Sequence, residues 1–311
     1  MRVLLLIFLI FVPTAAIAGQ GDVALYHDVA DEVTNGADYY DTVAKLHRER
    51  GYPLTPVVTV RSPALAYVAA TIGKTGLFIA AWALAFLGLA AWYIKLKDNS
   101  LAERATFMGL LAAGSGAFIS ESSIYTHEMF AGLLVTLALG LSWDRRLQVV
   151  AATLAVLFRE LAAPILFLIL YPFETQQTKR VATAMALIFG YYCWHFMKVS
   201  AVVRPSDLPS PGWFGSRGPS GLTDHLSTLV NFEFSPWFAF MPLVGWLMYR
   251  DRVPFVWCLG VVFAVCVIAR EDNLFWFLMS VPVYFAGLAF LLKPLSAIGT
   301  KLVASRADDN R

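Results

Sequence analysis

Apolar residues occur in long runs along the chain, and short segments that contain charges, Pro or Gly separate these runs. Four of the runs, residues 76–94, 181–197, 253–269 and 274–292, are each close to the length of a helix that spans a bilayer. Runs of this length predict membrane helices. The pattern therefore indicates an all-α fold.

When charged residues, Pro or Gly are taken as the ends of each apolar run, the pattern predicts a polytopic bundle of about ten transmembrane helices. The predicted spans are residues 3–18, 76–94, 105–119, 129–143, 148–158, 161–173, 181–199, 236–249, 253–269 and 274–292. The stretch 147–173 fits either one long helix or two short helices divided at Arg159 and Glu160. Two crossings keep the basic pairs at 145–146 and 179–180 on one side of the membrane, as short basic loops prefer. We therefore expect two helices.

Composition and charge agree with this interpretation. Hydrophobic residues make up 58% of the chain and charged residues 15%, against about 25% charged residues in soluble domains. With ten spans, fourteen of the 24 Lys and Arg but only seven of the 22 Asp and Glu lie on the cytoplasmic side. Both termini are then cytoplasmic, residues 1–293 form the transmembrane domain and residues 294–311 form a cytoplasmic tail. The net charge of +2 does not indicate a nucleic-acid partner.

Two outer segments are long enough to have structure of their own, residues 19–75 and 200–235. The first predicts short helices over 22–33 and 37–50, and the second of these suits the interface between lipid headgroups and water. Residues 200–235 are rich in Pro, Gly and Ser, as expected of a loop. Residues 3–18 fit either a cleavable signal peptide or an uncleaved first helix. In both cases the chain after Gly19 emerges on the outer side.

Ionisable residues gather at the outer ends of several predicted spans. They are Asp22, Glu121, His127, Glu128, Arg159, Glu160, Arg270, Glu271 and Asp272. One such residue alone is usually an interfacial charge in water. A set that brings carboxylates, an imidazole and guanidinium groups to one face offers a general base together with cations that hold a phosphate. The scattered His and Cys residues have no metal-ligand spacing, so no metal site is predicted.

The first outer segment resembles the corresponding loop of the GT-C membrane glycosyltransferases. Asp22 stands just past the first span with Tyr26 four residues later, Gly36 precedes Tyr39 by three residues, and Arg61-Ser62-Pro63 opens the returning helix. These features recur in that family. The chain departs from the family pattern in lacking a strict Asp-Glu pair after the first helix.

Later motifs extend the resemblance over most of the chain. His127-Glu128 looks like the start of the family's fourth helix, and Arg159-Glu160 resembles a basic-acidic pair at an outer turn between two short helices. Arg270, followed by Pro282 and Tyr284, is similar to the late outer arginine and Pro-containing helix of lipid-linked sugar transferases.

This resemblance implies the transfer of a sugar from a polyprenyl-phosphate carrier to a hydroxyl of a glycan, lipid or protein acceptor, with inversion. Asp22 would be the base. Arg159 and Arg270, with Arg61 and Lys74 behind them, would offset the charge of the leaving phosphate. The remaining substrate-binding candidates are Tyr26, His127, Glu128 and Glu160. Assistance by a divalent cation stays open. The implied location is the bacterial inner membrane, with the site on the periplasmic face.

Two other functions stay open, a transporter or flippase and a non-catalytic assembly subunit. Transporters commonly show paired repeats, which the chain lacks, and its ionisable residues cluster on one face, so the transferase is favoured. The second outer segment, with Trp213, Phe214 and Arg217, either covers the sugar or is a plain connector. His195 is expected to be a hydrogen-bonded core residue, and Gly114-Ser115-Gly116 a close contact between helices.

Overall fold

A computed structural model describes residues 20–117, 119–121, 123–171, 173–212, 214–230, 235–270 and 273–292. Within these ranges the protein is all-helical, with twelve α-helices. The only β-type pairing among them is an isolated bridge between Thr55 and Pro209. The all-α prediction is confirmed for this part of the chain. The predicted first span (3–18) and the tail (294–311) lie outside the described residues.

The first half of the chain contains α2 (Gln20–Thr34), α3 (Tyr39–Arg50), α4 (Ala64–Lys95), α5 (Leu101–Gly116), α6 (His127–Gly140) and α7 (Arg145–Phe158). The second half contains α8 (Pro164–Leu168), α9 (Thr175–Val202), α10 (Pro219–Val230), α11 (Pro236–Met248), α12 (Val253–Phe263) and α13 (Val281–Tyr284). Short 3-10 segments cover Val57–Thr59, Ser123–Tyr125, Glu160–Ala162, Leu274–Met279 and Phe285–Leu291, and a π-helix covers Ala264–Ile268.

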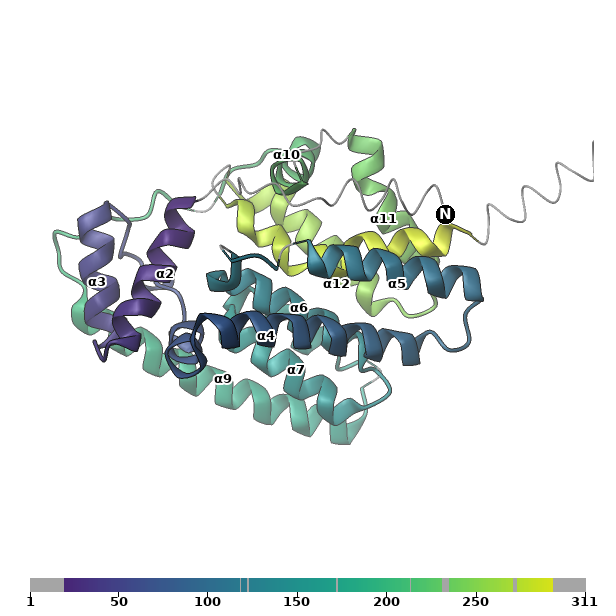
Figure 1. The fold of residues 1–311 in the computed structure, drawn as a ribbon, viewed down its shortest axis with the longest axis horizontal. Coiled ribbons are helices and arrows are strands. Elements are labelled where there is room, and N and C mark those ends of the chain that lie inside the picture. Colours follow the sequence, from purple (N-terminus) through teal and green to yellow (C-terminus); the bar gives the residue numbers. More distant parts are fainter. Residues whose placement is uncertain are drawn as a thin grey trace, which may run out of the picture.

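Helices α4, α5, α6, α7 and α9 run along the long axis of the molecule, while α2 and α3 lie at one end of this bundle (Figure 1). The amino ends of α4 and α6 and the carboxyl ends of α5, α7 and α9 point toward α2 and α3. The turns that were predicted to share the outer side therefore lie at the same end of the bundle. We call it the α2/α3 end.

Helix α3 illustrates how local sequence sets these elements. The Asp38 side chain accepts hydrogen bonds from the backbone N–H groups of Tyr40 and Asp41, and Gly51 ends the helix with a φ of 69°. The predicted apolar face is buried, but it packs against the protein, on α2 and α9, and forms a small core of its own. The expectation of an interfacial helix is thus corrected, because this face has partners within the chain.

Most predicted spans coincide with helices, but their regularity differs. The stretch 147–173 breaks at Arg159 and Glu160 as predicted, yet the expected helix over 161–173 is replaced by a 3-10 turn and the five-residue α8. The run 274–292 is mainly 3-10 helix rather than α-helix. The predicted loop 200–235 contains α10, which the sequence interpretation missed.

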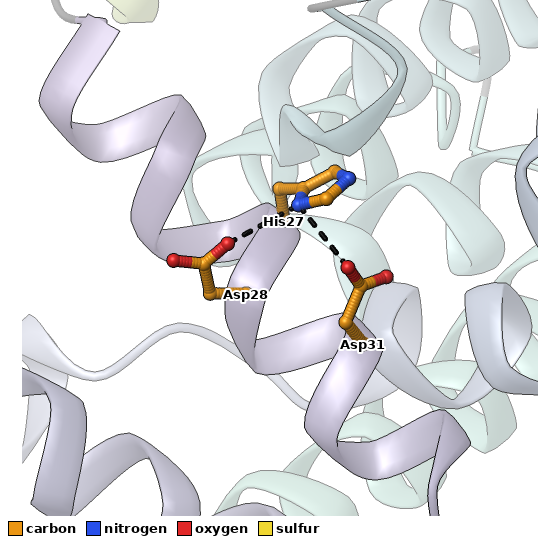
Figure 2. Close-up of side chains that lie close together, drawn as sticks. All are labelled: His27, Asp28 and Asp31. Atoms are coloured by element: carbon orange, nitrogen blue, oxygen red, sulfur yellow. Dashed lines mark hydrogen bonds and ion pairs between the residues drawn. The ribbon is translucent and has the colours of Figure 1, made fainter.

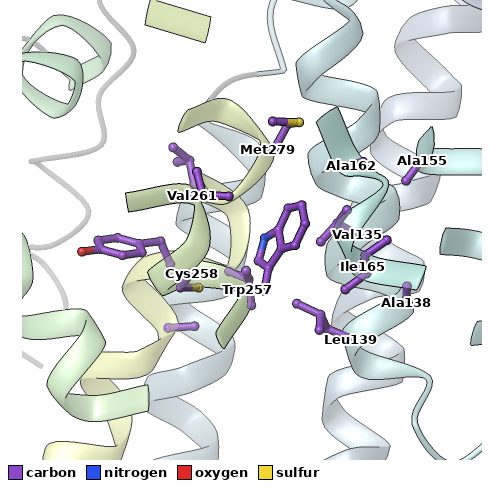
Figure 3. Close-up of a cluster of buried hydrophobic side chains, with 14 of the residues drawn as sticks. Val135, Ala138, Leu139, Ala155, Ala162, Ile165, Trp257, Cys258, Val261 and Met279 are labelled. Carbon is purple, nitrogen blue, oxygen red and sulfur yellow. The ribbon is translucent and has the colours of Figure 1, made fainter. Parts of the chain in front are cut away.

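The main apolar core lies inside the bundle. Trp257 projects from α12 toward Val135 and Ala138 of α6 and toward Ile165 of α8 (Figure 3). Close helix approach is visible at Gly114, as predicted: a Cβ there would lie 2.9 Å from the Pro282 carbonyl oxygen. His195 is also a core residue as predicted. Its Nδ1 lies 3.2 Å from the Tyr40 hydroxyl, and its Nε2 donates to the Val60 carbonyl oxygen at 3.2 Å.

One described helical stretch, Val57–Lys95, is long and apolar enough to cross a membrane, with a mean hydropathy of 2.1. The other apolar helices identified in the described ranges are shorter, at 10–17 residues. The ten-span membrane topology therefore remains a prediction.

Candidate functional site

An open cavity of about 370 Å³ lies at the α2/α3 end of the molecule. Its lining comes from five separate parts of the chain: Asp22, Leu25, Tyr26, His47, Gly51, Tyr52, Pro53, Thr59, Arg61, Ser210, Pro211, Gly212, Arg270 and Asn273. Four of the eight predicted site residues, Asp22, Tyr26, Arg61 and Arg270, thus line one cavity. No sequence pattern alone could establish this juxtaposition.

Asp22 and Tyr26 reach the cavity from α2. Asp22 stands in the first turn of this helix, where the helix dipole favours a negative charge. Tyr26 follows one turn later, so both side chains lie on the same helix face. The Tyr26 hydroxyl accepts a hydrogen bond from Arg61 Nε at 3.2 Å. Burial raises the pKa of Tyr26, with Glu128 and Asp22 adding to the shift and Arg61 opposing it, so its hydroxyl stays protonated.

Arg61 is held in the turn between the first 3-10 segment and α4. The Tyr39 hydroxyl donates to its carbonyl oxygen at 2.8 Å. The neighbouring Ser62 hydroxyl donates to the Leu157 carbonyl oxygen at 2.6 Å, which ties this turn to the end of α7. These contacts fix the backbone from which the guanidinium extends to the cavity.

A buried charge cluster lies behind the cavity. Arg159 Nε is 2.8 Å from Glu128 Oε1, with both side chains only 2% exposed, and a second nitrogen of Arg159 pairs with Glu160. Arg61 Nη2 lies 4.0 Å from the same Glu128 oxygen. Burial would raise the pKa of both glutamates, but Arg159 and Arg61 outweigh it and hold each pKa below its ordinary value. Both carboxylates are therefore ionised.

His127 joins this cluster through the first turn of α6. Its ring meets the Tyr26 ring edge-on at 5.1 Å, and its Nε2 donates to the Ser62 carbonyl oxygen at 3.2 Å. Burial lowers the pKa of His127 to about 4; Glu128 opposes this shift, while Arg61 and Arg159 strengthen it. At neutral pH the imidazole is uncharged, so it packs against the cluster without adding a positive charge to it.

The structure changes the roles expected of the cations. Arg159 is fully buried, pairs with two carboxylates and does not line the cavity, so it cannot hold a ligand phosphate there. Lys74 also lies elsewhere, in an exposed pair with Glu121 at 2.8 Å. Arg61, ranked behind Arg159 from sequence, reaches the cavity together with Arg270.

The second outer segment packs on both Arg270 and the first outer segment. A Cβ at Gly215 would lie 3.2 Å from Arg270 Cα, so the chain passes directly over this residue. Earlier in the same segment, Asp207 Oδ1 accepts a hydrogen bond from Arg48 Nε at 2.7 Å. Ser210, Pro211 and Gly212 also line the cavity.

The aromatic and basic residues suggested for covering the sugar lie elsewhere. Phe214 is exposed and Arg217 pairs with Asp224 at 2.8 Å, and neither lines the cavity. Trp213, Glu271 and Asp272 lie outside the described residues. Sequence reasoning also missed Tyr52 and Asn273, which do line the cavity. The only sequence signal for Tyr52 was its place in the Gly-Tyr-Pro break after α3.

One group of potential metal ligands was not predicted. His27, Asp28 and Asp31 of α2 bring their ligand atoms within 4.8 Å of one another (Figure 2). His27 Nδ1 lies 3.2 Å from Asp28 Oδ1 and 3.4 Å from Asp31 Oδ2, and Asp28 also pairs with Arg50. None of these three side chains lines the cavity. We interpret them as a surface ion-pair cluster.

No family model, curated protein or solved structure matches this chain.

Proposed function

We propose that this protein is a membrane glycosyltransferase that moves a sugar from a polyprenyl-phosphate carrier to an acceptor hydroxyl. The observation that carries the proposal is the shared cavity of Asp22, Arg61 and Arg270, residues far apart in the sequence. A carboxylate beside two guanidinium groups combines a general base with an anion site. The resemblance to GT-C transferases supports the same assignment.

The reaction needs one proton transfer and one bond exchange. Asp22 takes the proton of the acceptor hydroxyl while the hydroxyl oxygen attacks the anomeric carbon from the side opposite the phosphate. The bond from the anomeric carbon to the phosphate oxygen breaks, and the lipid phosphate leaves with the electron pair. Arg61 and Arg270 offset the charge that develops on this leaving group. Direct displacement of this kind inverts the anomeric centre.

A membrane location is supported by the outward-facing side chains of the long helices. On α4, Ile79 and Phe86 are 62% and 63% exposed, and on α9, Leu187 and Phe189 are 68% and 73% exposed. Soluble monomers rarely expose large apolar surfaces of this kind, whereas lipid tails cover them favourably. Under this proposal the charged cavity faces the periplasm.

An apolar groove lined by residues close in sequence to Glu160 and Arg270 further supports a lipid-linked donor. It has a volume of about 380 Å³ and lies among α8, α12 and the 3-10 segment Leu274–Met279. Its lining includes Leu161, the residue after Glu160, and Ile268, two residues before Arg270. A donor whose phosphate lies at Arg270 could place its apolar chain along this groove.

The lipid-linked sugars of cells that lack the protein test the proposal and also identify the donor. We expect one polyprenyl-phosphate sugar to accumulate, because its consumer is missing. Arg270→Ala should reproduce the accumulation, and should lower kcat/KM for the purified donor by about 10- to 100-fold through loss of a charge-assisted hydrogen bond.

Arg146→Ala is the matched control, because this exposed arginine lies in the first turn of α7, which starts at the opposite end of the bundle. It should behave as the wild type. Unchanged lipid-linked sugars in cells that lack the protein, together with defective uptake or efflux of a solute, would contradict the proposal and favour a transporter.

A further inference from the structure

The turn after α3 places Tyr52 at the cavity. Gly51 reverses the chain with its positive φ, and the Tyr52 N–H then donates to the His47 carbonyl oxygen at 2.8 Å. His47 Nδ1 in turn donates to the Pro53 carbonyl oxygen at 2.9 Å. Hydrogen bonds on both sides of Tyr52 thus fix its backbone. Its ring packs on that of His47 with the centroids 5.8 Å apart.

The Tyr52 hydroxyl lies directly against the first turn of α2. A Cβ built at Gly21 would lie 2.7 Å from the Tyr52 hydroxyl oxygen, so glycine leaves the space that this hydroxyl fills. Tyr52 and Asp22 line the same cavity. Burial, followed by the charge of Asp22 and a hydrogen bond to its side chain, raises the pKa of Tyr52 to about 12. The hydroxyl therefore carries its proton at neutral pH and is the donor.

We infer that Tyr52 is a positioning residue for Asp22: its hydroxyl donates to the carboxylate and orients it toward the cavity. This inference rests on the proposed function, in which Asp22 is the base. A carboxylate that accepts such a bond is favoured in its ionised form, and a fixed orientation reduces the reorganisation needed before the acceptor proton moves. A side chain at residue 21 would collide with the Tyr52 hydroxyl, which explains why a glycine precedes the base.

Other charged and titratable groups near Asp22 also affect its carboxylate, and their influence must be distinguished from that of the Tyr52 hydroxyl. Tyr26 lies on the same helix, His47 and Arg50 belong to α3, and Arg61 and Arg270 line the same cavity. The substitution Tyr52→Phe leaves all five in place and keeps the ring that packs on His47. Any change at Asp22 in this variant therefore reports the hydroxyl alone.

The test is the pH at which Asp22 becomes half-reactive toward a water-soluble carbodiimide, measured by mass spectrometry on the purified full-length protein. In Tyr52→Phe we expect this midpoint to rise by about one pH unit, which corresponds to one charge-assisted hydrogen bond. The midpoint of the acid limb in the pH profile of the transfer rate should move to higher pH by the same amount. In the same variant kcat should be lowered and KM for the donor unchanged.

Two further variants make the result specific. Gly21→Ala should shift the midpoint in the same direction, because its methyl group displaces the hydroxyl while Tyr52 is retained. Tyr67→Phe, at an exposed tyrosine of the following helix, should leave the midpoint unchanged. An unshifted Asp22 midpoint in Tyr52→Phe would overturn the inference. Absence of sugar transfer in the wild type would instead overturn the proposed function, while the carbodiimide midpoint would still decide the role of Tyr52.

Discussion

At the scale of single residues, burial separates the ionisable groups that line the cavity from those that pair inside the protein. Arg159 and Glu128 are hidden and neutralise each other, whereas Arg61 and Arg270 reach the cavity. The sequence brought Arg159, Glu128 and Arg270 to attention as charges at helix ends, and Arg61 through the motif Arg61-Ser62-Pro63 of the family resemblance. It could not rank them, because the ranking depends on which helix packs over which charge.

The pH dependence of stability should reveal the lowered pKa of His127 in the folded protein. Burial lowers its pKa from 6.5 to about 4, so below pH 6.5 the unfolded chain gains a proton that the folded protein does not. This contribution to the free energy of unfolding is complete above pH 6.5 and is lost as the pH falls toward 4, to a total of about 3 kcal/mol. His47, whose burial lowers its pKa likewise to about 4, contributes in the same window.

The measurement is the free energy of unfolding in detergent at pH 7.5, 6 and 5. His127→Gln should lose less stability between pH 7.5 and 5 than the wild type, with the His47 contribution retained. An identical pH dependence in both proteins would show that the pKa of His127 is not lowered in the folded protein.

At the scale of elements, α4 depends on a break at Gly73. This residue has a φ of 68° and a ψ of 177° inside an otherwise continuous helix, a combination that only glycine adopts readily. Gly73→Ala should therefore lower the free energy of unfolding by about 1–3 kcal/mol. Gly190→Ala is the matched control.

Gly190 lies in the regular helix α9 and has open space at its Cβ position. Alanine there should raise stability by about 0.5–1 kcal/mol. Thermal unfolding of both variants decides the point. A neutral or stabilising effect of Gly73→Ala would mean that the break is not a fixed feature of the helix.

The elements also show how far sequence pattern reaches. The break at Arg159 and Glu160 was predictable because two charges interrupt an apolar run. Helix α10 was not, because Pro, Gly and Ser dominate its surroundings, although Leu222 and Leu226 at helical spacing are both buried. The collapse of the run 161–173 into the short α8 depends on packing against α7, α9 and α12. No local pattern encodes that packing.

At the scale of the whole molecule, the proposed membrane location predicts that the two ends of the bundle face opposite sides of a membrane. In a Cys193→Ser background, Glu121→Cys should react with a membrane-impermeant maleimide in intact cells. Arg146→Cys should react only after permeabilisation, because α7 begins at the opposite end. Cys258 and Cys266 are buried and give little background. Labelling of both positions in intact cells would contradict the topology.

The cavity itself is a property of the whole molecule, since its lining comes from parts of the chain separated by more than two hundred residues. Sequence reasoning selected eight residues for one site. Asp22, Tyr26, Arg61 and Arg270 line the cavity, whereas His127, Glu128, Arg159 and Glu160 do not. The same reasoning missed Tyr52 and the wall formed by residues 210–212, because turns and loops carry no periodic signal that places them in space.

The most direct test of the central claim is sugar transfer by the purified protein from the polyprenyl-phosphate donor identified in the lipid extracts. The wild type should transfer the sugar with inversion. Asp22→Asn should be folded but slower by about 100- to 10,000-fold, the range expected for loss of a general base. A wild-type rate in Asp22→Asn would contradict the account.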